Sequence, residues 1–284
     1  MSVWAAPAKI NLSLQVAEAD GSGLHPLRSL VQTVEWCDLL TFEEGDEDRL
    51  TIIGADLPED GDNLIWKAVT ALRATAGIKQ PFFDINLEKA VSVAAGLGGG
   101  SSDAAATLFA AARLARVSPA VAEAVAPSVG ADVPFLMVGG TAWMEGFGET
   151  VSPVPLDPDY AVLVVVPPFE LETAAVYQTW DRLDRPQGTP VEGRRLPPSL
   201  RPFGPLANDL VPAAIALRPE LDDWIADMTD LFDGPVTMTG SGPALFGYFA
   251  DLDEAQSAWA AAPSEARAAV ATVPRRNGAA PVPD

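Results

Sequence analysis

A glycine-rich segment that leads into two serines and then into alanines holds the residues best suited to chemistry. It reads Gly-Leu-Gly-Gly-Gly-Ser-Ser-Asp-Ala-Ala-Ala over residues 96–106. Glycines let the backbone approach a ligand closely. The first N–H groups of a helix lack intrahelical partners and favour an anion such as phosphate. Since Ser101 and Ser102 can cap the helix or reach a phosphate or its metal, the segment predicts a site for a phosphorylated ligand.

Two common nucleotide-binding motifs do not fit this segment. No lysine follows the glycines at the spacing of a Walker A loop. The Gly-x-Gly-x-x-Gly fingerprint of dinucleotide-binding folds also fails, because no acidic residue stands at the end of a following strand. The remaining alternative is a flexible linker rich in Gly and Ser. A helix is predicted directly afterwards, over residues 102–116, which disfavours the linker.

Two further segments place polar residues on a tightly structured backbone. Near the N-terminus, residues 7–14 predict a strand with Lys9, Asn11 and Ser13 on one face and apolar side chains on the other. Near the C-terminus, residues 238–247 predict a Gly/Ser turn between two apolar strands. Taken alone, the first segment could be an edge strand and the second a hairpin loop.

The three segments, in this order, resemble the signature of the GHMP small-molecule kinases. The resemblance spans nearly the whole chain and narrows to the members that phosphorylate a cytidine diphosphate derivative of methylerythritol on the non-mevalonate route to isoprenoid precursors. It implies an ATP-dependent kinase that uses Mg²⁺ and acts on the 2-hydroxyl of this small-molecule substrate. The matching segments are Pro-Ala-Lys-Ile-Asn-Leu at 7–12, Ala-Ala-Gly-Leu-Gly-Gly-Gly-Ser-Ser-Asp-Ala-Ala at 94–105, Gly-Ala-Asp-Val-Pro-Phe at 130–135, Gly-Gly-Thr-Ala at 139–142, Asn-Asp-Leu at 208–210 and Thr-Gly-Ser-Gly-Pro at 239–243.

The resemblance implies catalytic roles for Asp132 and Lys9. Phosphoryl transfer from ATP depends on positioning and charge stabilisation, with a residue that receives the proton of the attacking hydroxyl. Asp132 is the candidate base, and a nearby Lys9 would favour the incipient alkoxide and the phosphoryl oxygens. From the residues alone, Asp132 could equally cap a turn, and Lys9 could lie along an edge strand. Asn11 either binds the substrate or orients Lys9.

The resemblance also assigns ATP binding to the glycine-rich segment and to the C-terminal turn. Residue 92 is Ser where the family usually has Pro, outside the glycine core of the motif. Either Ser101 or Ser102 is a candidate ligand of Mg²⁺. The implied ATP-binding residues are Ser92, Val93, Ala94, Ala95, Gly96, Leu97, Gly98, Gly99, Gly100, Ser101, Ser102, Gly240, Ser241 and Gly242.

The region after the first predicted strand departs from the family pattern. The family has Asp-Gly-Tyr-His there, and this chain has Asp-Gly-Ser-Gly-Leu-His over residues 20–25. His25 aligns with the histidine that reads cytosine, although a lone histidine is by default a structural or surface residue. Leu24 replaces the stacking tyrosine and lacks its aromatic contribution. Tyr177 aligns with the aromatic residue on the other face of the base, and Thr173 precedes it by one helical turn.

Composition limits the classes of partner. The formal charge of −21 disfavours nucleic acid as a partner. The single cysteine, Cys37, excludes an intrachain disulfide and fits a reducing cytoplasm. No apolar stretch is long enough to span a bilayer, and the N-terminus does not read as a signal peptide. We therefore expect a cytoplasmic protein, monomeric or homodimeric, that binds neither nucleic acid nor membrane.

The order of predicted elements gives an α+β protein with two lobes. The resemblance implies a ribosomal-protein-S5-like N-terminal lobe and a ferredoxin-like C-terminal lobe, divided into residues 1–150 and 151–284, with the active site between them. Residues 185–205 are expected to form a loop or a partly disordered segment, and the tail after Val273 is expected to be mobile. Strands are predicted over 2–16, 29–44, 82–88, 140–145, 160–166, 235–239 and 244–250, and helices over 63–77, 102–116, 119–126, 170–183, much of 208–232, and from 253 onward.

Two other functions compete with this interpretation. A kinase of the same superfamily that acts on a different alcohol would explain Leu24, and it would not need His25 or Tyr177. A nucleotide-binding protein without catalysis is the alternative from another class. The presence of both Lys9 and Asp132 argues against it, because a protein that only binds nucleotide has no need of both.

Overall fold

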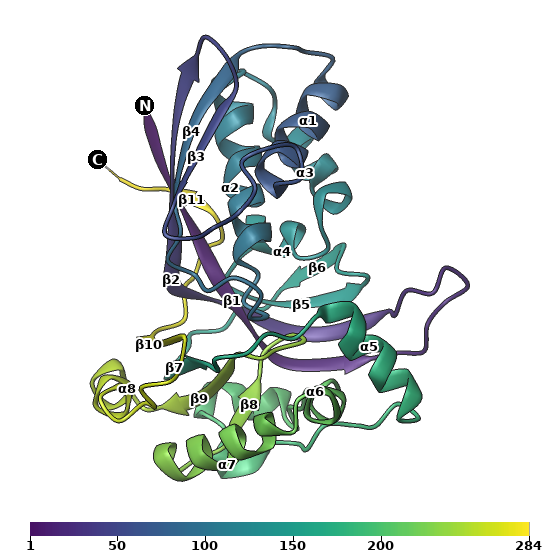
Figure 1. Cartoon of the computed structure of the whole chain (residues 1–284), viewed down its shortest axis with the longest axis vertical. Helices are drawn as coiled ribbons and strands as arrows, with labels where there is room; N and C mark the ends of the chain where they lie inside the picture. Colours follow the sequence, from purple (N-terminus) through teal and green to yellow (C-terminus); the bar gives the residue numbers. More distant parts are fainter. Residues whose placement is uncertain (284) are drawn as a thin grey trace.

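Two β-sheets, each covered by helices, form the two lobes of the chain. A computed structural model describes residues 1–283 (Figure 1). The first sheet has the order β11-β1-β2-β4-β3, with β5 paired to β2 and to β6. All its pairings are antiparallel except that of β3 with β4. Its strands are β1 (Ser2–Val16), β2 (Leu27–Gly45), β3 (Arg49–Ile53), β4 (Phe82–Glu88), β5 (Thr141–Gly146), β6 (Thr150–Pro153) and β11 (Ala280–Pro281).

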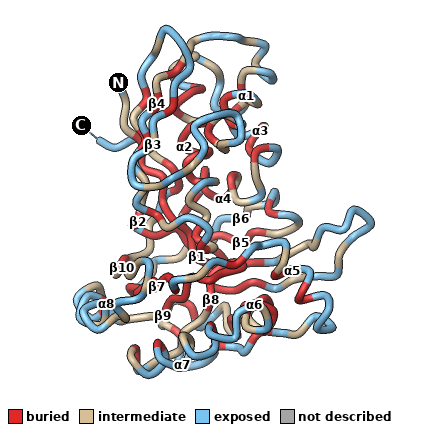
Figure 2. Tube along the Cα trace, viewed as in Figure 1, coloured by how far each residue is buried: buried red, intermediate tan, exposed pale blue. Residues whose placement is uncertain are grey.

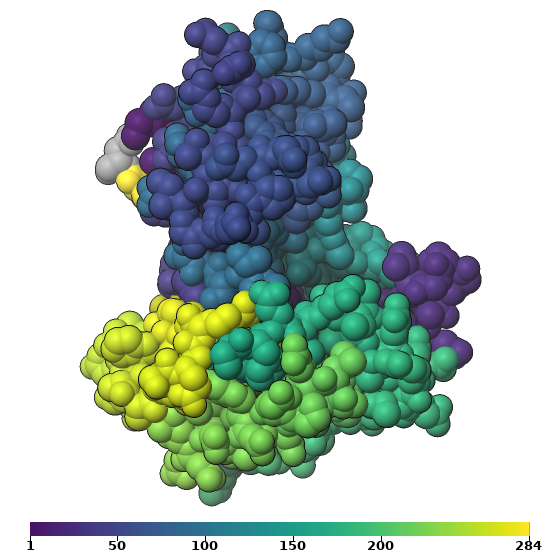
Figure 3. Space-filling model, viewed as in Figure 1, coloured from purple at the N-terminus to yellow at the C-terminus, as the bar shows by residue number. Residues whose placement is uncertain are grey.

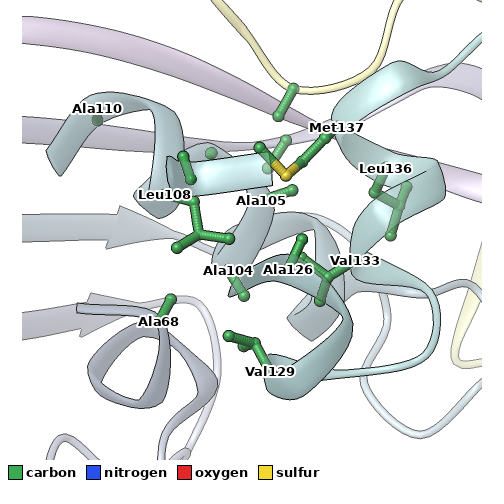
Figure 4. Close-up of a cluster of buried hydrophobic side chains, with 14 of the residues drawn as sticks. Ala68, Ala104, Ala105, Leu108, Ala110, Ala126, Val129, Val133, Leu136 and Met137 are labelled. Carbon is green, nitrogen blue, oxygen red and sulfur yellow. The ribbon is translucent and has the colours of Figure 1, made fainter. Parts of the chain in front are cut away.

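Helices of the first lobe cover one side of this sheet. Asn63 caps the first of them by accepting the N–H of Ile65. The second helix is buried along almost its whole length, because its alanines let neighbouring helices approach closely (Figures 2 and 4). The helices are α1 (Leu64–Ala76), α2 (Gly99–Leu114), α3 (Pro119–Val129) and α4 (Val133–Val138).

The second sheet is antiparallel, in the order β10-β7-β9-β8. Its central strand β7 is buried at every position, which confirms the prediction from its unbroken apolar run. Val162, Val164 and Val166 pack with residues of β1 and β2, while Leu163 and Val165 pack with α5, α6 and α7. The elements of this lobe are β7 (Ala161–Val166), β8 (Val236–Met238), β9 (Leu245–Phe249), β10 (Ala268–Thr272), α5 (Thr173–Arg182), α6 (Val211–Leu217), α7 (Glu220–Phe232) and α8 (Leu252–Trp259).

The long strand β1 links the two lobes. Its N-terminal half packs in the core of the first lobe, and Ile10, Leu12 and Leu14 pack against the second. The α+β class and the two lobes are thus confirmed, and the strands predicted over 2–16, 29–44, 82–88 and 140–145 are present. The division of the chain at residue 150 remains a prediction.

The C-terminal tail corrects one expectation. Residues 274–283 are not a mobile tail: they return to the first lobe, where Ala280 and Pro281 form β11 and pair with β1 (Figure 1). The Arg275 N–H donates to Thr33 O at 2.7 Å, and the Ala279 N–H donates to Leu136 O at 2.8 Å. Backbone hydrogen bonds hold this segment in place. Such bonds require no periodic pattern of side chains, so the sequence does not reveal them.

The segment 185–205 is ordered by short 3₁₀ turns. These turns are η1 (Gly193–Arg195) and η2 (Pro198–Phe203). Leu196 and Leu200 are buried in the core next to Val162 and Val164. The expected loop is therefore confirmed in outline, but its apolar residues pack it against the second lobe.

Candidate active site

A cleft of about 660 Å³ brings the three sequence motifs together. The surface is hollowed between the upper lobe and the lower lobe (Figure 3). The wall contains Lys9 and Asn11 from β1, residues 92–101, Asp132, and Gly240 with Ser241. Segments from both ends and from the middle of the sequence therefore meet around one space.

Lys9 and Asn11 share a face of β1, as predicted. The Lys9 ammonium donates a 2.6 Å hydrogen bond to Asn11 Oδ1 and lies 3.7 Å from Asp132 Oδ2. Asn11 is held in turn, since its Nδ2 donates to Ser29 Oγ at 2.8 Å and its backbone N–H donates to Thr239 Oγ1 at 2.9 Å. In this structure Asn11 therefore orients the Lys9 ammonium.

Asp132 stands in the turn directly before α4. Its side chain is 27% exposed, whereas that of Lys9 is 5% exposed. The carboxylate is thus open to the cleft and the ammonium is enclosed behind it. Burial, followed by the charge of Asp132, raises the pKa of Tyr177 to about 12. The Tyr177 phenol therefore keeps its proton at neutral pH beside the carboxylate.

The glycine-rich loop, residues 90–98, lies over Lys9 and the turn at 239–242. The backbone of Gly96 has a φ of +78°, and a Cβ there would lie 2.3 Å from Thr239 O. Gly98 has a φ of +70°, and a Cβ there would lie 2.9 Å from Lys9 Cγ. A side chain at either position would clash, so the loop needs glycine at both.

Asn208 holds the turn 239–242 against this loop. Its Nδ2 donates to Met238 O at 2.8 Å and to Gly240 O at 2.9 Å. The Ala244 N–H donates to Ala95 O at 3.1 Å, which joins the turn to the loop. Asn208 belongs to one of the segments that resemble the family, but the sequence alone assigned it no role. In the structure its buried amide holds the turn 239–242.

The helix that follows the loop starts earlier than predicted. It begins at Gly99, with Gly98 as its N-cap, whereas the sequence predicted a start at residue 102. As a result Ser101 lines the cleft, while Ser102 is turned into the core. Among residues 1–283, Ser102 Oγ has no hydrogen-bond partner. Neither serine is the cap, and Ser102 does not reach the cleft wall.

Gly242 also lies away from the wall. A Cβ there would meet Met238 Sδ at 2.3 Å and Leu171 Cδ1 at 3.2 Å. Its neighbours Gly240 and Ser241, although buried, line the cleft instead. The remaining predicted ATP-binding residues, Ser92–Ser101, line it.

A buried ion triad lies beside the first turn of α2. The Lys89 ammonium is 2.5 Å from Asp38 Oδ2 and 2.9 Å from Asp103 Oδ2. Burial raises the pKa of Asp103 to about 7, against the lowering effect of Lys89. Both Lys89 and Asp103 line the cleft. No sequence pattern predicts the triad, because its members are far apart in the chain.

The side of the cleft formed by α5 carries Thr173 and Tyr177. The Thr173 and Ser241 hydroxyls are 2.8 Å apart and hydrogen bonded. Both residues predicted for substrate binding on α5 thus line the cleft.

The structure places His25 behind Tyr177 rather than on the cleft wall formed by the described residues. Its ring stacks on Tyr177 at a centroid distance of 5.3 Å. Nδ1 faces Ala17 O at 3.0 Å, and Nε2 faces Asp181 Oδ2 at 3.2 Å. The ring edges are therefore occupied within the protein, and Leu24, in the place of the family tyrosine, is 58% exposed.

A wall segment that sequence reasoning missed lies before α1. Leu57, Pro58, Asp62, Asn63 and Leu64 line the cleft, and Leu64 Cδ1 would lie 3.5 Å from a Cβ on Gly100 in the first turn of α2. Asn63 Nδ2 donates to Pro58 O at 2.8 Å, which fixes this segment to the helix. The start of the helix predicted over residues 63–77 was the available signal. Apolar Leu57, Pro58 and Leu64 give this end of the cleft the character of a pocket for a flat ring.

Across residues 1–283, no three His, Cys, Asp or Glu side chains are grouped so as to hold a metal ion. In the same part of the chain, no helix combines the length and apolarity needed to cross a membrane.

Comparisons with known proteins agree with this geometry. Residues 63–140 match the family model of the GHMP kinases N terminal domain, and residues 197–268 match that of the GHMP kinases C terminal. The 4-diphosphocytidyl-2-C-methyl-D-erythritol kinase of Moorella thermoacetica is 37% identical, over 90% of this chain and 93% of its own length. The enzyme of the same name from Heliobacterium modesticaldum is 35% identical, over 90% of this chain and 89% of its own length.

Solved structures give the same result. A crystal structure of 4-(cytidine 5'-diphospho)-2C-methyl-D-erythritol kinase superposes with a TM-score of 0.77 and 32% identity, over 96% of this chain and 98% of the other. A homoserine kinase from Cytophaga hutchinsonii, at 17% identity, shares the fold with a TM-score of 0.72, over 99% of this chain and 97% of the other. With this cleft, these motifs and these relatives, the chain belongs to the 4-diphosphocytidyl-2-C-methyl-D-erythritol kinase family of the GHMP kinases.

Proposed function

We propose that the chain transfers the γ-phosphoryl group of ATP to the 2-hydroxyl of 4-diphosphocytidyl-2-C-methyl-D-erythritol. The observation that carries this proposal is the Lys9–Asp132 pair, 3.7 Å apart, in the cleft whose wall is the glycine-rich loop. A kinase needs a proton acceptor and a cation next to a phosphate site. The cleft offers both at one place.

The reaction needs little covalent chemistry from the protein. The substrate oxygen forms a bond to the γ-phosphorus, and the bond from that phosphorus to the β–γ bridging oxygen breaks. The hydroxyl proton passes to a carboxylate oxygen of Asp132, which faces the cleft. The Lys9 ammonium stabilises the negative charge that develops on the substrate oxygen and the phosphoryl oxygens. Asn11 holds that ammonium in place through its 2.6 Å hydrogen bond.

The glycine-rich loop and the start of α2 hold the phosphates. Backbone N–H groups at the start of α2 are free of intrahelical partners, and the helix dipole favours negative charge there. Beside the start of α2, Leu57, Pro58 and Leu64 accommodate the nucleoside. Thr173, Ser241 and Tyr177 line the opposite part of the cleft, where the cytidine diphosphate substrate binds.

Mg²⁺ enters this site on the phosphates of ATP. In kinases this ion neutralises charge that develops on the transferred group, and it is held by few protein groups together with phosphate oxygens. The Ser101 hydroxyl lines the cleft at the first turn of α2 and fits such a shared site. Ser102 does not fit it, because its side chain is buried in the core.

The test is transfer of label from γ-³²P-ATP to the acceptor. The cytidyl-diphospho-methylerythritol should become labelled. A phosphorus NMR spectrum of the product should show the signal of a new phosphate monoester. The matched control is the same acceptor without its 2-hydroxyl, which should remain unlabelled. If the native, folded protein labels neither compound but labels another alcohol, the proposed substrate is wrong.

A further inference from the structure

Three buried charges connect the elements on either side of the glycine-rich loop. Asp38 comes from β2, Lys89 directly follows β4, and Asp103 belongs to α2. Their side chains are 0%, 3% and 4% exposed. Lys89 bonds to both carboxylates, at 2.5 and 2.9 Å. The sheet and the helix are therefore joined through one ammonium group.

The same cluster holds the beginning of the loop. Asp38 Oδ1 accepts the N–H of Ala90 at 2.6 Å and that of Val91 at 2.8 Å. These are the first two residues of the loop, and Asp38 Oδ2 accepts Lys89 at the same time. Both oxygens of Asp38 are thus used to fix the point where the chain leaves the sheet.

The Lys89 ammonium also lies next to the end of the loop. A Cβ on Gly99, the first residue of α2, would lie 3.1 Å from the Lys89 ammonium. Asp103 lies one turn further along, and its Oδ2 accepts from Lys89. Within residues 1–283 its other oxygen has no hydrogen-bond partner although it is buried. In the described chain, Lys89 is therefore what holds the Asp103 carboxylate.

We propose that Asp38, Lys89 and Asp103 form a clasp that sets the shape of the glycine-rich loop for ATP, which makes Lys89 and Asp103 positioning residues for the kinase reaction. The clasp contacts both ends of a loop whose backbone takes positive φ values at Ala94, Gly96 and Gly98. A loop ordered in advance binds its ligand without the entropic cost of ordering it then. This inference rests on the proposed function, because ATP is the ligand.

The clasp lies apart from the groups that perform the chemistry. Lys9 and Asp132 belong to β1 and to the turn before α4, and they share no hydrogen bond with the triad. Weakening the clasp should therefore raise the KM for ATP and leave kcat nearly unchanged. A residue that acts in the phosphoryl transfer step would lower kcat instead.

Asp103 is the residue to change. Lys89→Met would leave two buried carboxylates next to each other without a counter-charge, and that variant could fail to fold. Asp103→Ala leaves the Lys89–Asp38 pair with balanced charge, and alanine suits a buried helical position. Thr107→Ala is the matched control, because Thr107 is buried one turn further along α2 and donates only to Asp103 O.

The experiment measures ADP release with ATP varied at saturating acceptor. For Asp103→Ala we expect the KM for ATP to rise about tenfold, because ATP must then order the loop when it binds, with kcat within a factor of about three. Thr107→Ala should keep both constants. Native-state hydrogen exchange should show faster exchange at residues 90–100 in Asp103→Ala, and unchanged exchange in β2 and β4.

An unchanged KM and unchanged exchange in Asp103→Ala would overturn the clasp, and so would a loss of kcat at constant KM. If Asp103→Ala does not fold, Asp103→Asn keeps the shape and removes the charge. The clasp then predicts a several-fold rise in the KM for ATP, and an unchanged value contradicts it. Native protein that releases no ADP would contradict the proposed function, whereas active native protein with unchanged variants contradicts the clasp alone.

Discussion

Lys9 is an enclosed cation whose shortest hydrogen bond is to a neutral amide. The Asn11 oxygen is 2.6 Å away, and the Asp132 carboxylate is farther, at 3.7 Å. A charge held in this way is only partly balanced in the free protein. It is therefore available to the negative charge that develops during phosphoryl transfer, and interactions of that kind raise kcat.

Replacing Lys9 by methionine tests this role. Lys9→Met keeps the hydrocarbon part of the side chain against Gly98, and it leaves Asp132 partly exposed rather than buried. We expect kcat to fall at least about a hundredfold, with a nearly unchanged melting temperature. Lys67→Met, at an exposed position of α1, is the control. A variant that loses less than about threefold in kcat would show that Lys9 does not act in the transition state.

Cys37 gives a prediction on reactivity. Burial raises the pKa of its thiol from 9.0 to about 11. The thiolate is the reactive form, so at pH 8 the folded protein holds about a hundredth of the thiolate of an unperturbed cysteine. We expect a thiol reagent to modify native Cys37 roughly a hundredfold more slowly than the urea-unfolded chain, with the native rate still rising up to pH 11. Equal rates in both states would contradict the burial.

At the scale of elements, α1 serves both the fold and the cleft through Asn63. Its Oδ1 caps the helix by accepting the Ile65 N–H at 3.0 Å, and its Nδ2 donates to Pro58 O in the cleft wall. Asn63→Ala should lower the free energy of unfolding by about 1 kcal/mol and raise the KM for ATP. Urea unfolding and steady-state kinetics measure the two effects.

Asn63→Asp separates these two roles. The carboxylate still accepts the helix N–H, but it has no hydrogen to donate to Pro58 O. Stability should therefore stay close to that of the native chain, while the KM for ATP still rises. If Asp restores both properties, the contact with Pro58 does not shape the cleft.

Elements with a repeating or continuous apolar pattern could be predicted from the sequence. Helix α1, with its cap at Asn63, and strand β7 are of this kind. Helix α4 was missed because its six residues are mostly buried, so no polar face marks the period. The start of α2 was misplaced because Gly98, with its positive φ, takes the cap position that the serines were expected to hold.

Some residues of the candidate site could be predicted from the sequence, and others could not. Contiguous motifs could be read directly, and the structure brings Lys9, Asp132 and the glycine-rich segment to one cleft. The triad Asp38–Lys89–Asp103 could not be found, because each member is an ordinary residue until folding removes it from water. His25 was matched by alignment, but its place depends on Asp181 and Tyr177, which come from α5.

At the scale of the whole molecule, the C-terminal segment closes the first lobe. Gly278 crosses so near Gly139 that a Cβ on Gly139 would lie 1.8 Å from the Gly278 nitrogen. The Ala279 N–H donates to Leu136 O, and the Val282 N–H donates to Val3 O, both at 2.8 Å. This segment therefore ties β1 to the helix that follows Asp132.

Deletion of residues 275–284 should destabilise the whole chain. It removes backbone hydrogen bonds to Thr33, Leu136, Val138 and Val3, each with a net value of about 1 kcal/mol. We expect the free energy of unfolding to fall by about 3 kcal/mol or more, measured by urea titration. Deletion of residues 283–284 alone is the control and should change little. Equal stability of both truncated chains would contradict the packing of the tail.

ADP release with MgATP and the cytidyl-diphospho-methylerythritol substrate, measured for the native protein and for Asp132→Asn, tests both the reaction and its base. Asn keeps the size of the side chain but does not accept a proton as a carboxylate does. We predict turnover by the native protein and a loss of at least about a hundredfold in kcat in the variant, with ATP still bound. Undiminished turnover by Asp132→Asn would contradict the assignment of the base, and no turnover by native protein that binds ATP would contradict the proposed reaction.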